Sequence, residues 1–232
     1  MTLMPRDNPY IEDMLETTTV QPARPITVPI RALGPAHRQR IGVHLLALDA
    51  DDRYLRFGYS ATDEQIGRYV AGLDFDRDDI FGIYNRKLEL IAMAHLALSP
   101  APEHRACAEF GVSVLKQARG RGFGTRLFER AAIHARNEGV DLLFIHALTQ
   151  NTAMIRIASN AGATLERAGS ETDAYLRLPR ATLDSRMTEI VEEQLAKTDY
   201  QLKLQARSFR AFLAGLQDVR RGVQDGRRRS AD

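Results

Sequence analysis

The stretch Arg119-Gly120-Arg121-Gly122-Phe123-Gly124 (RGRGFG) places three glycines and two arginines between an apolar run and a helical pattern. A strand that leads through glycines into a helix leaves several backbone N–H groups unpaired at the positive end of the helix dipole. Glycine lets the main chain approach an anion closely, and the arginines add charge that can pair with it. The stretch therefore predicts an anion-binding loop, with a tight turn that only serves packing as the alternative.

Two common phosphate-binding motifs fit this loop poorly. A Walker loop requires Lys followed by Ser or Thr after its last glycine, whereas Thr125 and Arg126 follow here. A dinucleotide-binding fingerprint belongs after an early first strand, and this stretch lies in the middle of the chain, although Asp141 has about the spacing of the expected acidic residue. Neither motif accounts for the loop.

The segments around the loop predict one mixed α/β domain. Apolar runs typical of strands lie at residues 26–31, 80–84, 88–98, 106–115, 142–148, 164–168 and 174–178. Helical patterns lie at residues 35–48, 62–72, 124–137 and 151–162. The predicted order is strand, two helices, three strands, helix, strand, helix and two strands.

Changes in composition divide the chain into four parts. We expect a loose N-terminal arm over residues 1–25, the α/β domain over 26–180, a helical extension over 181–222 and a basic tail over 223–232. The extension carries leucines and a phenylalanine at helical spacing, and a capping box at Thr198 and Gln201 makes two helices as plausible as one. This apolar stripe either packs back on the domain or contacts a partner, such as a second copy of the chain.

The composition indicates which classes of binding partner and which cellular compartment to expect. The chain has 232 residues, and its 32 Lys and Arg are nearly balanced by 30 Asp and Glu, which argues against nucleic acid as a partner. Cys107 is the only cysteine, and neither a signal-peptide core nor a membrane-spanning run is evident. We therefore expect a cytoplasmic protein without membrane contact. The histidines show no metal-ligand spacing, so we predict no metal site.

The loop and its flanks resemble one family. Arg119, Gly122 and Gly124 match the pyrophosphate-loop pattern Arg/Gln-x-x-Gly-x-Gly/Ala of the GNAT superfamily of N-acetyltransferases. The stretches AEFGVSVL (108–115), LLFIHALTQN (142–151) and NTAMIRIASNAGA (151–163) are similar to the family's fourth strand, fifth strand and following helix. With DDRYLRFGY (51–59), the chain looks most like the acetyltransferase module of bacterial protein lysine acetyltransferases.

The resemblance implies a fold and a cosubstrate. The fold would be a mixed, mostly antiparallel sheet with splayed fourth and fifth strands, flanked by helices, and acetyl-CoA would lie in the gap. By position in the family, the backbone of Val112 and Val114 would pair with the pantetheine arm. Asn151 would contact the cosubstrate, or would only cap a helix. The pyrophosphate would bind the amides of Arg119, Gly120, Arg121, Gly122, Phe123, Gly124 and Thr125.

The resemblance also implies a reaction, the transfer of acetyl to a primary amine. Glu109 matches the glutamate base of the lysine acetyltransferases, and a base is needed because the acceptor arrives as an ammonium. Many family members carry a tyrosine as general acid where this chain has Ala158, which leaves Tyr175 and Ser159 as substitutes. We expect a protein lysine as acceptor slightly more than a small-molecule amine, with a non-catalytic acetyl-CoA sensor as the alternative.

We expect structural roles for several other histidine, aromatic and arginine residues. We expect His95 and His146 to be hydrogen-bonded histidines of the strands rather than proton relays. In residues 52–57, we expect Tyr54 and Phe57 to pack inward and Arg53 and Arg56 to form ion pairs.

Overall fold

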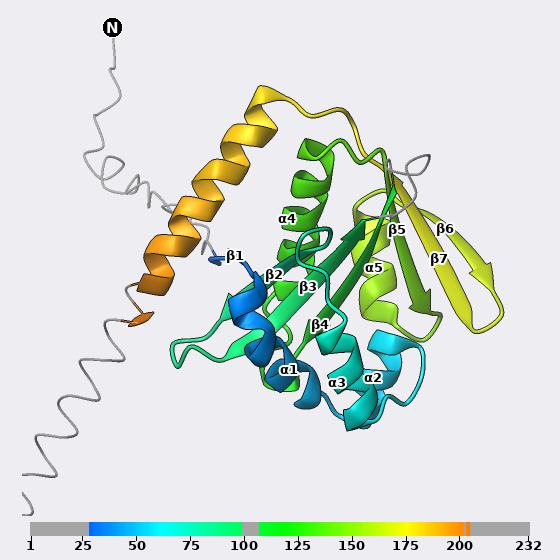
Figure 1. Cartoon of the computed structure of the whole chain (residues 1–232). Coiled ribbons are helices and arrows are strands. Elements are labelled where there is room, and N and C mark those ends of the chain that lie inside the picture. The colour runs from blue at the N-terminus through cyan, green and yellow to red at the C-terminus, as the bar shows by residue number, and fades with distance from the viewer. Residues whose placement is uncertain (1–27, 99–106, 202, 205–232) are drawn as a thin grey trace, which may run out of the picture.

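The computed structural model describes residues 28–98, 107–201 and 203–204. Its centre is a seven-stranded sheet in the order β1-β2-β3-β4-β5-β7-β6 (Figure 1). All neighbouring strands are antiparallel except β4 and β5, which are parallel. The strands are β1 (Arg31–Ala32), β2 (Asp79–Tyr84), β3 (Leu90–Leu98), β4 (Cys107–Val114), β5 (Leu142–Leu148), β6 (Thr164–Ala168) and β7 (Glu171–Arg177).

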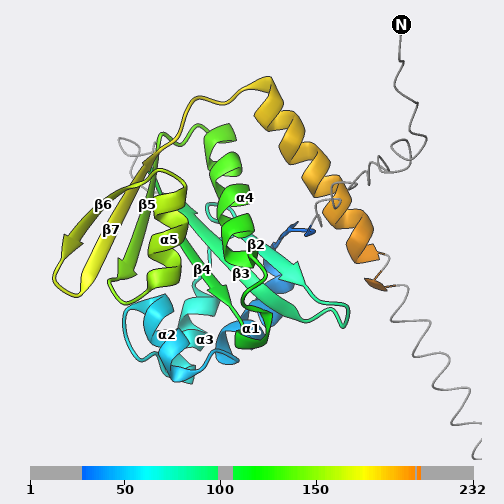
Figure 2. The same cartoon turned by 180° about the vertical axis from the view of Figure 1, so that it is seen from behind.

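Helices cover both faces of the sheet. The helices are α1 (Arg38–Leu46), α2 (Ala50–Phe57), α3 (Asp63–Ala71), α4 (Phe123–Asn137) and α5 (Thr152–Asn160). Because side chains alternate along a strand, the two faces of β3 bury different residues. Met93 packs with α1 and α3, whereas Ala92 and Ala94 pack with α4 and α5, which lie on the other face (Figure 2).

The parallel pair β4 and β5 separates after a short contact. Cys107, Ala108 and Glu109 pair with Leu142, Leu143 and Phe144, and over the described residues the pairing ends there. The remainder of β4, from Phe110 to Val114, pairs with β3 alone. One edge of β4 therefore has no neighbouring strand just before the chain enters the glycine loop, which is the predicted splay.

Two sequence predictions about the N-terminal half are wrong in detail. The first strand pairs over Arg31 and Ala32 only, opposite Gly82 and Phe81, rather than over residues 26–31, of which 26 and 27 lie outside the described part. Helix α2 was not predicted at all. It begins at an Asp49 cap, whose side chain accepts a hydrogen bond from the Asp52 amide, and ends at Gly58 in the left-handed conformation.

The C-terminal extension forms one helix from residue 183 through residue 201. The Thr198 hydroxyl donates to the Gln194 carbonyl in mid-helix, so the predicted second capping box is not formed and the two-helix alternative is wrong for this segment. Residues 205–232, with the predicted end of the extension and the basic tail, lie outside the described residues.

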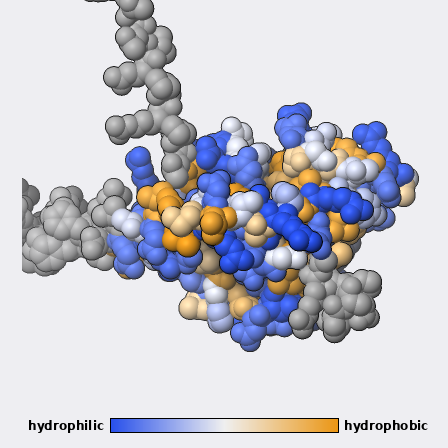
Figure 3. Space-filling model, turned by 90° about the horizontal axis from the view of Figure 1, so that it is seen from above, coloured by the Kyte–Doolittle hydropathy of each residue, from blue (hydrophilic) through white to orange (hydrophobic). Residues whose placement is uncertain are grey.

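This helix packs on the domain through polar residues together with Ala196, which is buried, and Tyr200. Glu189 accepts hydrogen bonds from Arg130 and Asn137 of α4, and the Tyr200 ring lies under the Arg31 guanidinium. Its large apolar side chains up to Leu195 are exposed, and Figure 3 shows apolar patches among polar residues on one face of the molecule. Of the predicted stripe, Leu195 alone is described; its other members, at positions 202, 209, 213 and 216, lie outside the described residues. The exposed set is Leu183, Met187, Ile190, Val191 and Leu195.

Candidate active site

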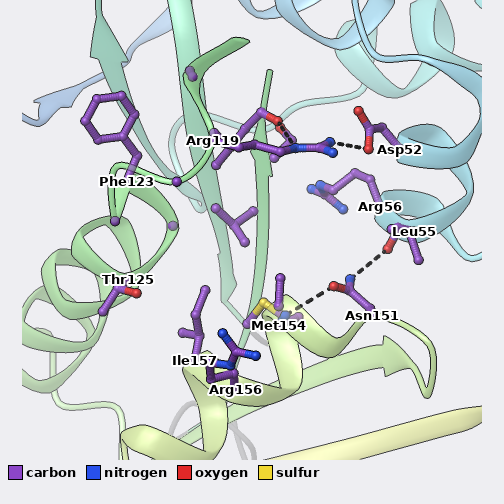
Figure 4. Close-up of a pocket in the computed structure, with 18 of the residues that line it drawn as sticks. Asp52, Leu55, Arg56, Arg119, Phe123, Thr125, Asn151, Met154, Arg156 and Ile157 are labelled. Atoms are coloured by element: carbon purple, nitrogen blue, oxygen red, sulfur yellow. Dashed lines mark hydrogen bonds and ion pairs between the residues drawn. The ribbon is translucent and has the colours of Figure 1, made fainter. Parts of the chain in front are cut away.

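A pocket of about 430 Å³ opens beside the unpaired edge of β4 (Figure 4). Its walls come from α2, the end of β4, the glycine loop with the start of α4, and α5. It is lined by Leu48, Asp52, Leu55, Arg56, Val112, Ser113, Val114, Ala118, Arg119, Gly120, Gly122, Phe123, Gly124, Thr125, Asn151, Ala153, Met154, Arg156, Ile157 and Asn160.

The glycine loop and the start of α4 form one wall of this pocket. Gly120 and Gly122 adopt the left-handed conformation, with φ of 75° and 73°, which side-chain-bearing residues rarely adopt. Gly122 is the N-cap of α4 and provides no capping side chain. The first amides of a helix have no partner within the helix, so those of α4 are available to an anion at the positive end of the helix dipole. The start of α4 without a capping side chain agrees with the sequence, and binding of an anion there stays a prediction.

Arg119 links the loop to two other walls. Its guanidinium forms an ion pair with Asp52 of α2, and its Nε donates to the Val114 carbonyl at 3.2 Å. The sequence predicts that the positive charge of Arg119 pairs with a bound anion, but in the structure Asp52 already balances part of this charge. The two contacts hold the end of β4 and the start of α2 around the loop.

Asn151 serves as a helix cap and also lies on the pocket wall. Its Oδ1 accepts a hydrogen bond from the Met154 amide at 3.1 Å, as expected of an N-cap, and its Nδ2 lies 3.5 Å from the Leu55 carbonyl. The capping role is confirmed. Asn151 also joins α5 to α2 across the pocket (Figure 4), so loss of its side chain would disturb both walls.

The pocket brings together most, but not all, of the predicted site residues. Val112, Val114, Asn151 and the loop residues from Arg119 to Thr125 lie on its wall, except Arg121, which is exposed. Glu109 also lies outside the lining. It is exposed on β4, on the same face of the strand as Gly111 and Ser113, beyond the end of the pocket.

The residues considered as general acids do not line the pocket. Ala158 is buried in the core, 1% exposed, so its side chain faces the sheet rather than the pocket. Ser159 is exposed on α5, and Tyr175 lies on β7 opposite Phe144. Neither substitute is among the residues that the pocket brings together.

The sequence reasoning missed the contribution of α2. Asp52, Leu55 and Arg56 all line the pocket, and the local signals for their helix were the Asp49 cap and Gly58 at its end. Arg53 pairs with Asp63 at 2.7 Å, as predicted. Arg56 was expected to form an ion pair, but it forms none with the described residues.

The two strand histidines have hydrogen-bond partners, as expected. The rings of His95 and His146 contact Asp78 at 3.1 Å and Asp173 at 2.7 Å, respectively. Within the described residues, no group of three or more His, Cys, Asp and Glu side chains is placed to hold a metal ion. No helix in the same part of the chain has the length and apolarity that a bilayer crossing requires.

Comparisons with known proteins agree with this geometry. The profile of the Acetyltransferase (GNAT) family matches residues 46–162. Solved structures with the same fold include the GNAT domain of S. lividans PAT, at 20% identity and a TM-score of 0.56, covering 66% of this chain and 95% of that one.

Another is spermidine N-acetyltransferase from Vibrio cholerae in complex with CoA and spermine, at 17% identity and a TM-score of 0.52, covering 65% of this chain and 95% of that one. Likeness at this level of identity shows the fold alone. Among curated proteins, none matches the chain significantly. The family profile spans half of the chain, from the end of α1 to the end of α5, and includes the loop and the walls of the pocket. The chain therefore belongs to the Acetyltransferase (GNAT) family and has its α/β fold.

Proposed function

We propose that the protein is an acetyl-CoA-dependent N-acetyltransferase that acts on a primary amine. The observation that carries this proposal is the pocket where β4 and β5 separate, closed at one end by the uncapped first turn of α4. An elongated cosubstrate with an anionic middle fits such a site. The amides around Gly122 and Gly124 would bind the pyrophosphate, and the free edge of β4 at Val112 and Val114 would pair with the pantetheine arm.

Glu109 is the proposed general base. It precedes Gly111 on the same face of β4, at the end of the strand farther from the loop, where the acyl end of a cosubstrate bound along β4 would point. An acceptor ammonium must lose a proton before its nitrogen can attack, and a carboxylate at this place can accept that proton. Its exposure also leaves the proton a direct path to solvent.

The sheet surface beside Glu109 supports a cationic acceptor. Strand register places Phe144 opposite both Glu109 and Tyr175, and the two aromatic rings lie 5.3 Å apart between centroids. Asp173 and His146 form the next pair on the same face. Aromatic faces and carboxylates both attract ammonium groups, so this surface suits an amine in its protonated form.

A protein lysine is the acceptor that we favour slightly, on the resemblance to protein lysine acetyltransferases. Glu109 and its neighbours on β5 and β7 form an open sheet surface that a peptide side chain can reach. A small-molecule amine is the alternative, and the solved structures of the same fold include a spermidine acetyltransferase. An acetyl-CoA sensor without turnover is the other alternative.

The test is a screen of lysine peptides and free amines with acetyl-CoA, with release of the CoA thiol as the signal. We expect turnover that Glu109→Gln lowers by roughly 100-fold, the usual range for loss of a general base, with the dissociation constant of acetyl-CoA unchanged. Glu138→Gln, which changes an exposed glutamate at the C-terminal end of α4, should keep wild-type activity. Tight binding of acetyl-CoA without turnover of any amine would support the sensor. Absence of binding would contradict the proposal as a whole.

A further inference from the structure

Arg56 lies against the backbone of β4 at the far end of the pocket from the glycine loop. An ideal Cβ built on Gly111 would lie 2.8 Å from the Arg56 Cζ, so the guanidinium occupies the space that a side chain would need. Figure 4 shows the Arg56 side chain extending from α2 into the pocket, between Arg119 and Asn151. Gly111 precedes Val112, so this cation lies beside the strand edge proposed to hold the acyl end of the cosubstrate.

The charge of Arg56 is not balanced by a carboxylate. Arg53 pairs with Asp63 and Arg119 pairs with Asp52, whereas Arg56 makes one hydrogen bond, from its Nη2 to the Tyr69 hydroxyl at 3.0 Å, and no ion pair with the described residues. A cation held beside a cavity without a counter-ion favours binding of negative charge in that cavity.

A chain of hydrogen bonds holds Arg56 in place. Tyr69 of α3 contacts the His95 Nδ1 at 2.7 Å, and the His95 Nε2 contacts Asp78 at 3.1 Å. Burial raises the pKa of Asp78, but hydrogen bonds from Arg77 and His95 outweigh this effect and lower it below its ordinary value. Asp78 is therefore ionised near neutral pH and can only accept.

The ionised Asp78 determines which atom donates and which accepts in each of these hydrogen bonds. The His95 Nε2 carries the hydrogen, and Nδ1 of the neutral ring accepts the hydrogen of Tyr69. The pKa of His95 is lowered, first by burial and then by Arg56, which keeps the ring neutral. The hydroxyl hydrogen of Tyr69 is thus committed to His95, and its oxygen is left to accept from Arg56.

Strand β4 contributes one hydroxyl group to the pocket wall, that of Ser113, and this group is not placed to donate a proton to the leaving sulfur. The His44 Nδ1 lies 2.8 Å from the Leu90 carbonyl, so Nδ1 carries the hydrogen, and Nε2 accepts from Ser113 at 2.8 Å. The pKa of His44 is lowered to about 4, chiefly by burial, so the ring is neutral at pH 7. The Ser113 hydrogen therefore points away from the pocket, and Ala158 has none to donate.

We infer that Arg56 is a catalytic residue that stabilises the departing CoA thiolate, and that Tyr69, His95 and Asp78 are positioning residues for it. The inference rests on the proposed acetyl transfer. In that reaction a C–N bond forms and the C–S bond breaks, with the electron pair of the C–S bond leaving on sulfur. The acceptor ammonium loses two protons in turn, one before its nitrogen attacks and one as the amide forms, and each passes to Glu109 and on to solvent. Arg56 balances the negative charge on sulfur, so no proton donor is needed at that atom.

The first test needs no turnover. CoA is bound to the protein, and its thiol is titrated by the ultraviolet absorbance of the thiolate, in a Cys107→Ser background because Cys107 is the only cysteine of the chain. Bound desulfo-CoA provides the blank, which removes the absorbance of the tyrosines. The charged and titratable groups around Arg56 are Tyr69, His95 with Asp78, Glu109, His44, and Arg119 with Asp52, and the pocket wall also carries Arg156. All of them are retained in the comparison of Arg56→Gln with wild type.

We expect the pKa of the bound thiol to lie about one unit or more below that of free CoA, since an opposite charge within a few ångströms lowers a pKa by roughly one to three units. Arg56→Gln should return it to the free value, and Tyr69→Phe, which releases Arg56 but keeps the ring, should return it in part. Arg68→Gln, on the exposed side of α3, should leave it lowered. An unshifted thiol in the bound wild-type protein would overturn the inference but not the proposed function.

Turnover provides the second test. Arg56→Gln should lower kcat by roughly 100-fold, as for loss of one donor to a developing negative charge, with little change in the dissociation constant of acetyl-CoA. A loss of acetyl-CoA binding that accounts for the loss of rate would overturn the inference, because Arg56 would then only bind the cosubstrate. If Arg56→Gln does not fold, kcat and the dissociation constant of acetyl-CoA are compared in Tyr69→Phe instead.

Discussion

Gly111 is the residue on which the placement of Arg56 depends. Its missing side chain lets the guanidinium approach to a distance that a Cβ would not allow. The strand places His95 directly opposite Gly111, so the arginine, the glycine and the hydrogen-bond chain meet on one face of the sheet. A single methyl group at this position therefore tests the role of Arg56 without removing its charge.

We expect Gly111→Ala to lower kcat by at least roughly tenfold, because the new Cβ displaces the guanidinium from the pocket wall. Binding of acetyl-CoA should change little. Gly67→Ala is the matched control, since a Cβ at Gly67 on α3 would meet nothing within 4 Å. In a double-mutant cycle, Gly111→Ala and Arg56→Gln should be far from additive. Additive losses would show that Gly111 acts independently of Arg56.

At the scale of the elements, docking of the C-terminal helix depends on groups that titrate in opposite directions. Burial raises the pKa of Glu189, but hydrogen bonds from Asn137, His134 and Arg130 outweigh it and lower the pKa to about 2. Burial lowers the pKa of His134, but Asp79 and Glu189 outweigh it and raise the pKa above 6.5. The charged form of Glu189 therefore favours the docked helix, and that of His134 does so through its contact with Glu189, whereas its contact with Asp79 of β2 lies within the domain.

The sign of each shift gives the pH range in which docking is strongest. The contribution of Glu189 is complete above its unfolded pKa near 4.5 and is lost as the pH falls toward 2. The contribution of His134 is complete below pH 6.5 and is lost as the pH rises through its folded value. Protection of the amides of residues 183–201 from hydrogen exchange should thus be greatest between about pH 4.5 and 6.5.

At the pH of greatest protection, Glu189→Gln should lower these protection factors by roughly tenfold, since hydrogen bonds between charged groups contribute about 1.5–3 kcal/mol and the amide keeps some of them. Glu193→Gln, whose side chain pairs only with Lys197 along the same helix among the described residues, should leave them unchanged. Equal protection in Glu189→Gln and wild type would show that this cluster does not hold the helix.

The elements also show what the sequence can and cannot predict. The strands of the sheet and helices α3 to α5 follow from apolar periodicity, caps and glycines, which are local signals. Half of the residues of helix α2 are charged, and its place in the pocket depends on partners such as Arg119 that are distant in the sequence. The polar contacts of the extension were not predicted, because Glu189 and Tyr200 bind Arg130 of α4 and Arg40 of α1, which are distant in the sequence.

In the candidate site, too, local sequence signals predicted some features, and others depend on tertiary contacts. The loop was predictable because glycines at positions 120 and 122 are needed for a left-handed backbone before a helix. The roles of Arg56 and Ser113 were not, because each is set by tertiary hydrogen bonds, to Tyr69 and His44. A resemblance supplied Glu109, and its part in the reaction stays a prediction.

At the scale of the whole molecule, the central claim is that acetyl-CoA lies between the separated ends of β4 and β5 with its pyrophosphate at the glycine loop. The direct measurement is a titration of the protein with acetyl-CoA, followed by the backbone amide resonances in nuclear magnetic resonance. We predict that the largest shifts occur at residues 119–125 and 112–114, on both sides of the pocket. Absence of binding, or shifts confined to other parts of the chain while the loop amides stay unchanged, would contradict the claim.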